Sequence, residues 1–130
     1  MIVIDASVLV NVIGDDGRDG ARARAVVARA GDLSAPDLVD VETVSVLRKR
    51  WLEGALTARR FSAAVSDLEV LPLIRYPTLA LMRRAYALRA NLTAYDAAYV
   101  ALAESIGCHL VTADRRLANA PGPRCAVELV

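Results

Sequence analysis

The segment TAYDAAYVALAESIGCHLVT, residues 93–112, decides the fold class. Its first part is apolar on nearly every helical face, a pattern typical of a buried helix. The helix is expected to end at Gly107, and residues 108–112 then form a short apolar run that predicts a strand. A buried helix that leads directly into a buried strand is typical of α/β proteins with a parallel sheet.

The rest of the chain alternates short apolar runs with longer amphipathic stretches in the same way. We expect strands at residues 2–4, 33–35, 69–75, 108–112 and 125–129. We expect helices at residues 7–13, 20–30, 36–53, 57–68, 77–90 and 93–107, and a helical turn near Asp114. At 130 residues and 55% hydrophobic, the chain is expected to form one α/β domain spanning residues 1–130.

Composition excludes several classes of protein. No apolar stretch reaches the length of a membrane-spanning helix, and the first residues lack the basic flank of a secretory signal, so we expect a cytoplasmic protein without membrane contact. Cys108 and Cys125 lack zinc-site spacing and are too few for a disulfide framework, so we expect two reduced thiols on strands. His109 is the only histidine, which excludes a two-histidine ribonuclease mechanism.

Four carboxylates stand at places that suggest a common site. Asp5 ends the first predicted strand, Asp114 follows the fourth, and Glu42 and Asp96 lie in the first turns of predicted helices. Each also has a structural explanation by itself. Asp5 and Asp114 would cap helices, Asp96 would form a capping box with Thr93, and Glu42 would be an exposed helix position.

Taken together, the four positions favour a metal site. Asp5 and Asp114 lie beyond the carboxyl ends of parallel strands, where open sheets bind ligands, and Glu42 interrupts an apolar stripe at the same edge. Asp96 is expected at the opposite edge if its helix runs antiparallel to the sheet, although a short or tilted helix would bring it to the others. Unpaired carboxylates repel one another, and a hard divalent cation such as Mg²⁺ removes that repulsion.

The net charge of +1 conceals an uneven distribution. Setting the four carboxylates aside leaves 16 basic and 11 acidic residues, and every basic residue except Lys49 is arginine. Arginine binds phosphate through two parallel hydrogen bonds, so this composition suits a phosphate-rich partner. Composition alone favours the simpler interpretation of ordinary solvated charge.

Three segments resemble the motifs of PIN-domain ribonucleases. MIVIDASVLVNVI, residues 1–13, is similar to their first strand and helix, with Asp5 and Ser7 in the matching positions. LSAPDLVDVETVSVLRKRWLEG, residues 33–54, is similar to the second motif, and LTAYDAAYVALAESIGCHLVTADRRL, residues 92–117, is similar to the third and fourth. The resemblance covers almost the full chain. It implies a three-layer fold with a parallel five-stranded sheet in strand order 3-2-1-4-5 and helices on both faces.

The resemblance also implies a function. The chain is similar to the toxins of VapBC-type toxin–antitoxin pairs, which implies Mg²⁺- or Mn²⁺-dependent hydrolysis of RNA by metal-activated water. The implied site has three aspartate ligands, a completing glutamate and two orienting hydroxyl groups: Asp5, Asp96, Asp114, Glu42, Ser7 and Thr112. A cognate antitoxin and a homodimer are the implied protein partners. Some relatives carry a further acidic residue after the fourth motif; residues 115–119 hold none, so the number of metal ions stays open.

Residues outside the motifs are candidates for contacts with partners. Arg115 and Arg116, next to Asp114, are expected to touch the RNA backbone at the pocket rim, and two solvated arginines on a turn are an equally good interpretation. Residues 61–71 and 79–88 are more apolar than one buried face requires. Among the aromatic residues, Tyr76 and Tyr86 are candidate interface anchors, whereas Trp51 is expected in the core.

Two other functions stay open. A catalytically silent PIN-like module would bind RNA or protein without cleavage, although all four acidic positions are filled. An aspartate-based phosphotransfer domain is the weaker alternative. A receiver domain needs a lysine after its last strand, whereas Lys49 lies in a predicted helix, and a haloacid-dehalogenase-like phosphatase needs an aspartate where Ser7 stands. The sequence does not identify the RNA or the cleavage site.

Overall fold

The computed structural model describes residues 1–130 and contains one five-stranded sheet in which every pairing is parallel. The strand order is β3-β2-β1-β4-β5, which confirms the expected order. The strands are β1 (Ile2–Ile4), β2 (Leu33–Pro36), β3 (Leu73–Tyr76), β4 (His109–Thr112) and β5 (Val127–Leu129). Because β1 lies in the centre of the sheet, the residue that follows it is flanked by the ends of β2 and β4.

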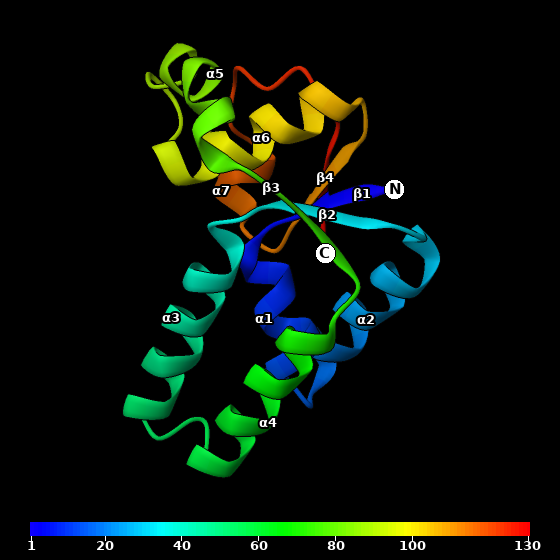
Figure 1. The fold of residues 1–130 in the computed structure, drawn as a ribbon, viewed down its shortest axis with the longest axis vertical. Coiled ribbons are helices and arrows are strands. Elements are labelled where there is room, and N and C mark those ends of the chain that lie inside the picture. Colours follow the sequence, from blue (N-terminus) through cyan, green and yellow to red (C-terminus); the bar gives the residue numbers. More distant parts are fainter.

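Helices cover both faces of the sheet, as Figure 1 shows. One face carries α1 (Ala6–Gly14), α2 (Arg18–Ala30), α3 (Val39–Leu52) and α4 (Ala58–Val70). The other carries the 3-10 helix η1 (Thr78–Leu81), α5 (Met82–Ala87) and α6 (Ala94–Ile106), and the short α7 (Arg115–Ala118) follows β4. α3 and α4 pack against α1 and against each other, and they extend away from the sheet (Figure 1).

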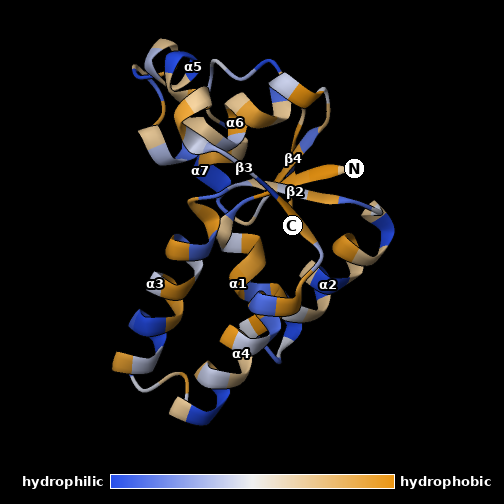
Figure 2. Cartoon of the chain, viewed as in Figure 1, coloured by the Kyte–Doolittle hydropathy of each residue, from blue (hydrophilic) through white to orange (hydrophobic).

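The hydrophobic core lies on both sides of the central strands. Val3 and Ile4 of β1 are fully buried, and Figure 2 shows hydrophobic residues gathered along α1 and the strands. In α6 every residue from Ala97 to Ala103 is buried, because the helix packs against β1, β2 and β4 on one side and α5 and η1 on the other. The expectation of a buried helix before β4 is therefore confirmed.

Prolines explain two predicted boundaries that are wrong. α4 continues to Val70, so residues 69 and 70 are helical and not part of a strand. Pro72 disfavours the helical conformation at Leu71, whose ψ is 126°, and β3 begins only at Leu73. Pro36 does not open the long helix: it is the last residue of β2.

Three further expectations need correction. The helix expected at residues 77–90 is divided into η1 and α5, and it ends at Ala87. Trp51 is not in the core but 43% exposed, because the end of α3 extends beyond the sheet. Cys108 and Cys125 are free thiols that precede β4 and β5, so they do not lie on strands. No helix has the length and apolar character needed to cross a membrane.

Candidate active site

The four carboxylates singled out in the sequence line one cavity at the carboxyl edge of the sheet. Asp5 follows β1, Glu42 lies in α3, Asp96 lies in α6, and Asp114 follows β4. The cavity has a volume of about 360 Å³. Its other lining residues are Ala6, Ser7, Val10, Asn11, Val46, Arg50, Tyr99 and Ala113.

Asp5 is the most buried of the four carboxylates, with only 5% of its surface exposed. It caps α1 by accepting a hydrogen bond from the Val8 amide at 3.1 Å, so the structural interpretation of this residue is also correct. Its carboxylate accepts two more bonds, from Ser7 Oγ at 2.5 Å and from Thr112 Oγ1 at 2.5 Å. Burial raises the pKa of Asp5 above its ordinary value, and these hydrogen bonds offset only part of the rise.

The hydroxyl groups of Ser7 and Thr112 join the ends of β1 and β4. Ser7 Oγ accepts a hydrogen bond from the Ala113 amide at 2.9 Å, and Thr112 Oγ1 accepts one from the Asp114 amide at 2.9 Å. Since each hydroxyl receives a backbone N–H, its own hydrogen is directed at Asp5. Ser7 and Thr112 therefore lie where they can hold the Asp5 carboxylate in one orientation.

Asp96 lines the same cavity, as the family resemblance implied, and the simple rule that placed the start of its helix at the opposite edge of the sheet is wrong. α6 delivers the chain to the N-terminal end of β4, so a helix antiparallel to the strands has its own start at their carboxyl edge. Thr93 caps this helix by accepting a hydrogen bond from the Asp96 amide at 3.1 Å. Burial raises the pKa of Asp96, and the carboxylate of Asp114 raises it further.

Glu42 is held by Tyr99, which was not among the site residues predicted from the sequence. The Tyr99 hydroxyl donates a hydrogen bond to Glu42 Oε1 at 2.7 Å, and Tyr99 is 1% exposed. Burial raises the pKa of Glu42, and the nearby charges of Asp96 and Asp5 act in the same direction. The same environment raises the pKa of Tyr99, so its hydroxyl stays protonated and remains a donor.

Asp114 differs from the other three carboxylates because it has a cationic neighbour. Its Oδ1 accepts the Arg116 amide at 2.8 Å and caps α7, and its Oδ2 accepts the Arg116 guanidinium at 3.2 Å. Burial opposes ionisation of Asp114, but the bonds from Arg116 outweigh it and hold the pKa below its ordinary value. The Arg116 side chain is 87% exposed, and neither it nor Arg115 lines the cavity.

The donor chemistry of the cavity fits a hard divalent cation. All available ligands are oxygens, and Asp5, Glu42 and Asp96 make no ion pair with arginine or lysine. As the side chains stand, no group of three acidic, histidine or cysteine residues is placed to hold one ion. Asp114 instead accepts hydrogen bonds from the Arg116 amide and guanidinium. Releasing that exposed ion pair would cost about 1 kcal/mol or less.

Three polar lining residues were missed in the sequence: Tyr99, Asn11 and Arg50. Each follows a singled-out residue at helical spacing. Tyr99 is three residues after Asp96, Asn11 is four after Ser7, and Arg50 is eight after Glu42. Residues at these spacings share one helix face, so helical periodicity applied to the candidate residues would have made these three candidates as well.

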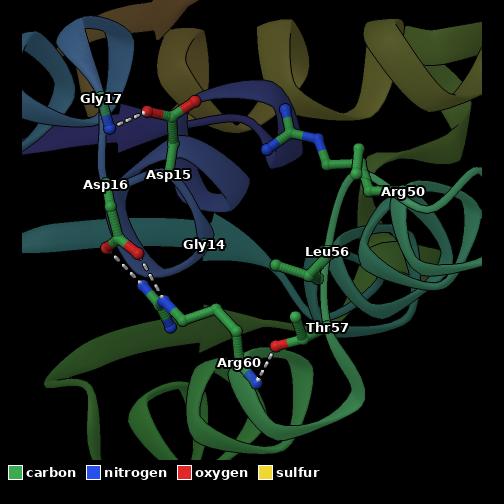
Figure 3. Close-up of a pocket in the computed structure, with 9 residues that line it drawn as sticks. Gly14, Asp15, Asp16, Gly17, Arg50, Leu56, Thr57 and Arg60 are labelled. Atoms are coloured by element: carbon green, nitrogen blue, oxygen red, sulfur yellow. Dashed lines mark hydrogen bonds and ion pairs between the residues drawn. The ribbon is translucent and has the colours of Figure 1, made fainter.

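A larger cavity, of about 620 Å³, lies beside Arg50 and is drawn in Figure 3. Its two acidic residues already have partners within the protein. Asp15 accepts the Gly17 amide at 2.8 Å, and Asp16 forms an ion pair with Arg60 at 2.9 Å (Figure 3). This cavity contains only two acidic residues, and one of them is neutralised by Arg60, so it is a weaker candidate for metal chemistry than the smaller one.

Known proteins resemble this chain along its full length. The PIN domain family matches residues 2–123. Ribonuclease VapC9 of Mycobacterium tuberculosis is 42% identical over 130 residues, which cover 100% of this chain and 98% of the relative. Ribonuclease VapC12 of the same organism is 36% identical, covering 100% and 99%.

Solved structures share the fold. VapC20 of Mycobacterium tuberculosis, described as a Sarcin-Ricin loop cleaving toxin, superposes with a TM-score of 0.71 at 16% identity, covering 90% of this chain and 92% of that one. PAE2754 from Pyrobaculum aerophilum superposes with a TM-score of 0.61 at 26% identity, covering 89% and 82%.

Proposed function

Because this chain belongs to the PIN domain family, we propose that it is an endoribonuclease toxin of the VapC type, which hydrolyses phosphodiester bonds in RNA. The observation that carries the proposal is the cavity in which Asp5, Glu42 and Asp96 lie together without a basic partner. Their pKa values are raised by burial and by neighbouring carboxylates, which is the usual environment of functional carboxylates.

The cofactor in this proposal is Mg²⁺, with Mn²⁺ as the alternative. Asp5, Asp96 and Asp114 would hold the cation directly, and Glu42 would complete the site. A divalent cation bound there would neutralise the carboxylates, polarise the phosphate and favour ionisation of water. The support for this part is the oxygen-only donor set and the absence of ion pairs at three of the four acidic residues.

The protein's own groups would act by positioning and protonation. Ser7 and Thr112 hold Asp5 in one orientation through hydrogen bonds of 2.5 Å, and Tyr99 holds Glu42. Glu42, which lines the cavity beside Asp5 and Asp96, would accept a proton from the attacking water. Arg116 would release Asp114 when the cation binds, and it would then be free to contact the RNA.

Cleavage of a labelled RNA by the purified protein tests the proposal. We expect cleavage in Mg²⁺, loss of cleavage in EDTA, and loss of cleavage in Asp5→Asn and Asp96→Asn. Glu104→Gln is the matched control, since Glu104 is a carboxylate of α6 that pairs with Arg84 outside the cavity. Cleavage that persists in EDTA would exclude this mechanism. RNA binding without cleavage would favour the catalytically silent module.

The protein partners are also proposals. An antitoxin and a homodimer follow from the family resemblance, and an apolar groove between α3 and α4 supports a protein contact. Trp51, Phe61 and Val65 line this groove together with Ala58, Ser62, Ser66 and Glu69. Size-exclusion chromatography with light scattering tests the dimer, and co-purification with the protein encoded beside it tests the antitoxin.

A further inference from the structure

Arg50 has a position that the carboxylates do not explain. It lies in the last turn of α3, and its Nη2 donates a hydrogen bond to Asn11 Oδ1 at 3.1 Å. No carboxylate comes within ion-pair distance of Arg50, although the residue is half-buried beside an acidic cavity. The guanidinium has five N–H groups, so most of its donors remain free for an anion.

A small cavity next to the carboxylates contains a second free arginine. It has a volume of about 300 Å³ and is lined by Asn11, Asp19, Arg22, Arg50, Ala113 and Val130. Asn11, Arg50 and Ala113 also line the carboxylate cavity, so the two are adjacent. Arg22 is exposed and makes no ion pair. The cavity thus has two arginine side chains against one aspartate.

The positions of Glu42 and Arg50 along α3 show how far the two cavities extend from each other. Glu42, Val46 and Arg50 follow one another at one-turn intervals on the same face. At 1.5 Å per residue, Arg50 lies about 12 Å along the helix axis from Glu42. A phosphate bound in the smaller cavity, between Arg50 and Arg22, would therefore be a different phosphate from one held among the carboxylates.

We propose that Arg50, Asn11 and Arg22 form a subsite for a non-scissile phosphate of RNA, beside the phosphate that is cleaved. The inference rests on the proposed function because it takes RNA to be the ligand. Arginine binds a phosphate through paired N–H groups, and the Asn11 amide fixes the guanidinium before the ligand arrives. The subsite also offsets the repulsion between the RNA and the acidic cavity.

Binding of a short fluorescein-labelled single-stranded RNA, measured by anisotropy in EDTA so that no cleavage occurs, tests the subsite. We expect Arg50→Ala to bind about tenfold more weakly. The slope of log affinity against log salt should fall by about 0.7, since one phosphate contact is lost. Arg48→Ala is the matched control: it removes the same charge from the same helix, and Arg48 is exposed and lines none of these cavities. It should change neither quantity.

Two further measurements separate phosphate binding from a purely structural role. Asn11→Ala breaks the same hydrogen bond but keeps the charge of Arg50, so its salt slope should match that of the wild type. In RNAs with a single uncharged methylphosphonate, one position next to the cleaved bond should weaken wild-type binding and leave Arg50→Ala binding unaffected.

The outcomes distinguish this inference from the nuclease proposal. If the wild type cleaves RNA in Mg²⁺ but Arg50→Ala binds with unchanged affinity and salt slope, the subsite is wrong and the nuclease stands. If the wild type binds RNA through Arg50 but does not cleave it in Mg²⁺, the subsite stands and the nuclease is wrong. If the wild type neither binds nor cleaves RNA, both are wrong.

Discussion

Thr112 Oγ1 donates a hydrogen bond to Asp5 Oδ2 at 2.5 Å, across 107 residues of sequence. The same hydroxyl accepts the Asp114 amide at 2.9 Å, so one threonine contacts two of the proposed metal ligands. Both strands end at this point, and their pairing brings Ile4 beside Val111. The contact therefore depends on the central position of β1 in the sheet.

Thr112→Val should reduce metal affinity without unfolding the protein. Valine keeps the shape of the side chain but removes the bonds to Asp5 and to the Asp114 amide. Losing such a support typically weakens metal binding about tenfold to a hundredfold. The measurement is the Mg²⁺ concentration that gives half-maximal cleavage. Thr112→Ser keeps the hydroxyl and should stay close to the wild type. An unchanged Mg²⁺ requirement in the valine variant would mean that Thr112 does not position Asp5 for metal binding.

Mg²⁺ should raise the melting temperature of the wild type at neutral pH. A ligand at one hundred times its dissociation constant stabilises the folded state by about 2.7 kcal/mol. Asp5→Asn and Asp96→Asn should lose most of this shift, and excess EDTA should reverse it in the wild type. Glu104→Gln, outside the cavity, should keep the full shift. Equal shifts in all four proteins would mean that Mg²⁺ binds elsewhere.

The metal-free protein should show a carboxylate-dependent loss of stability as pH rises. The folded state raises the pKa of Asp5 above 3.8, so it binds a proton that the unfolded chain has released. Protonation of Asp5 therefore increases the free energy of unfolding at acidic pH, and this stabilisation is lost as pH rises through the folded-state pKa.

Asp5→Asn isolates this contribution. The difference in unfolding free energy between Asp5→Asn and the wild type, followed by chemical denaturation in EDTA, should grow in favour of the variant as pH rises above 3.8. The comparison removes the opposite effect of groups such as Glu104, whose pKa is lowered. A difference that is constant with pH would show that Asp5 ionises normally.

Tyr99→Phe should lower activity through Glu42. The variant removes the hydroxyl that donates to Glu42 at 2.7 Å and keeps the buried ring, so the stability cost should be about 1 kcal/mol. Cleavage rates should fall in Tyr99→Phe but change little when the same substitution is added to Glu42→Gln, because the partner is already altered. If the two substitutions change the rate independently and additively, Tyr99 does not act through Glu42.

Glu104→Gln should destabilise the fold and leave the active site intact. Glu104 accepts two hydrogen bonds from Arg84, at 2.7 and 3.1 Å, and one from the Arg124 amide at 2.7 Å. The hydrogen bonds from Arg84 are the main reason that the pKa of Glu104 lies below 4.5. The ionised Glu104 therefore stabilises the fold above that pH, and this stabilisation is lost as pH falls through the lowered pKa. Losing the charge should cost about 1–3 kcal/mol at neutral pH, measured by denaturant unfolding.

Local patterns determined most of the elements and most of the candidate site. An apolar run that ends in Asp5, a helix apolar on all faces and the caps at Thr57 and Thr93 are properties of neighbouring residues, and the structure has them where they were expected. The places of Asp5, Glu42 and Asp114 followed from the predicted strand ends. The place of Asp96 and the strand order followed from motifs that resemble a known family, and the observed order confirms that resemblance.

Tertiary structure decided what depends on how the elements meet. The direction of α6 relative to the sheet put Asp96 in the cavity, and the extension of α3 beyond the sheet exposed Trp51. Tyr99, Asn11 and Arg50 became part of the site only because three helices converge there. Periodicity shows which residues share a face of one helix, but only the packing of helices against the sheet shows what each face meets.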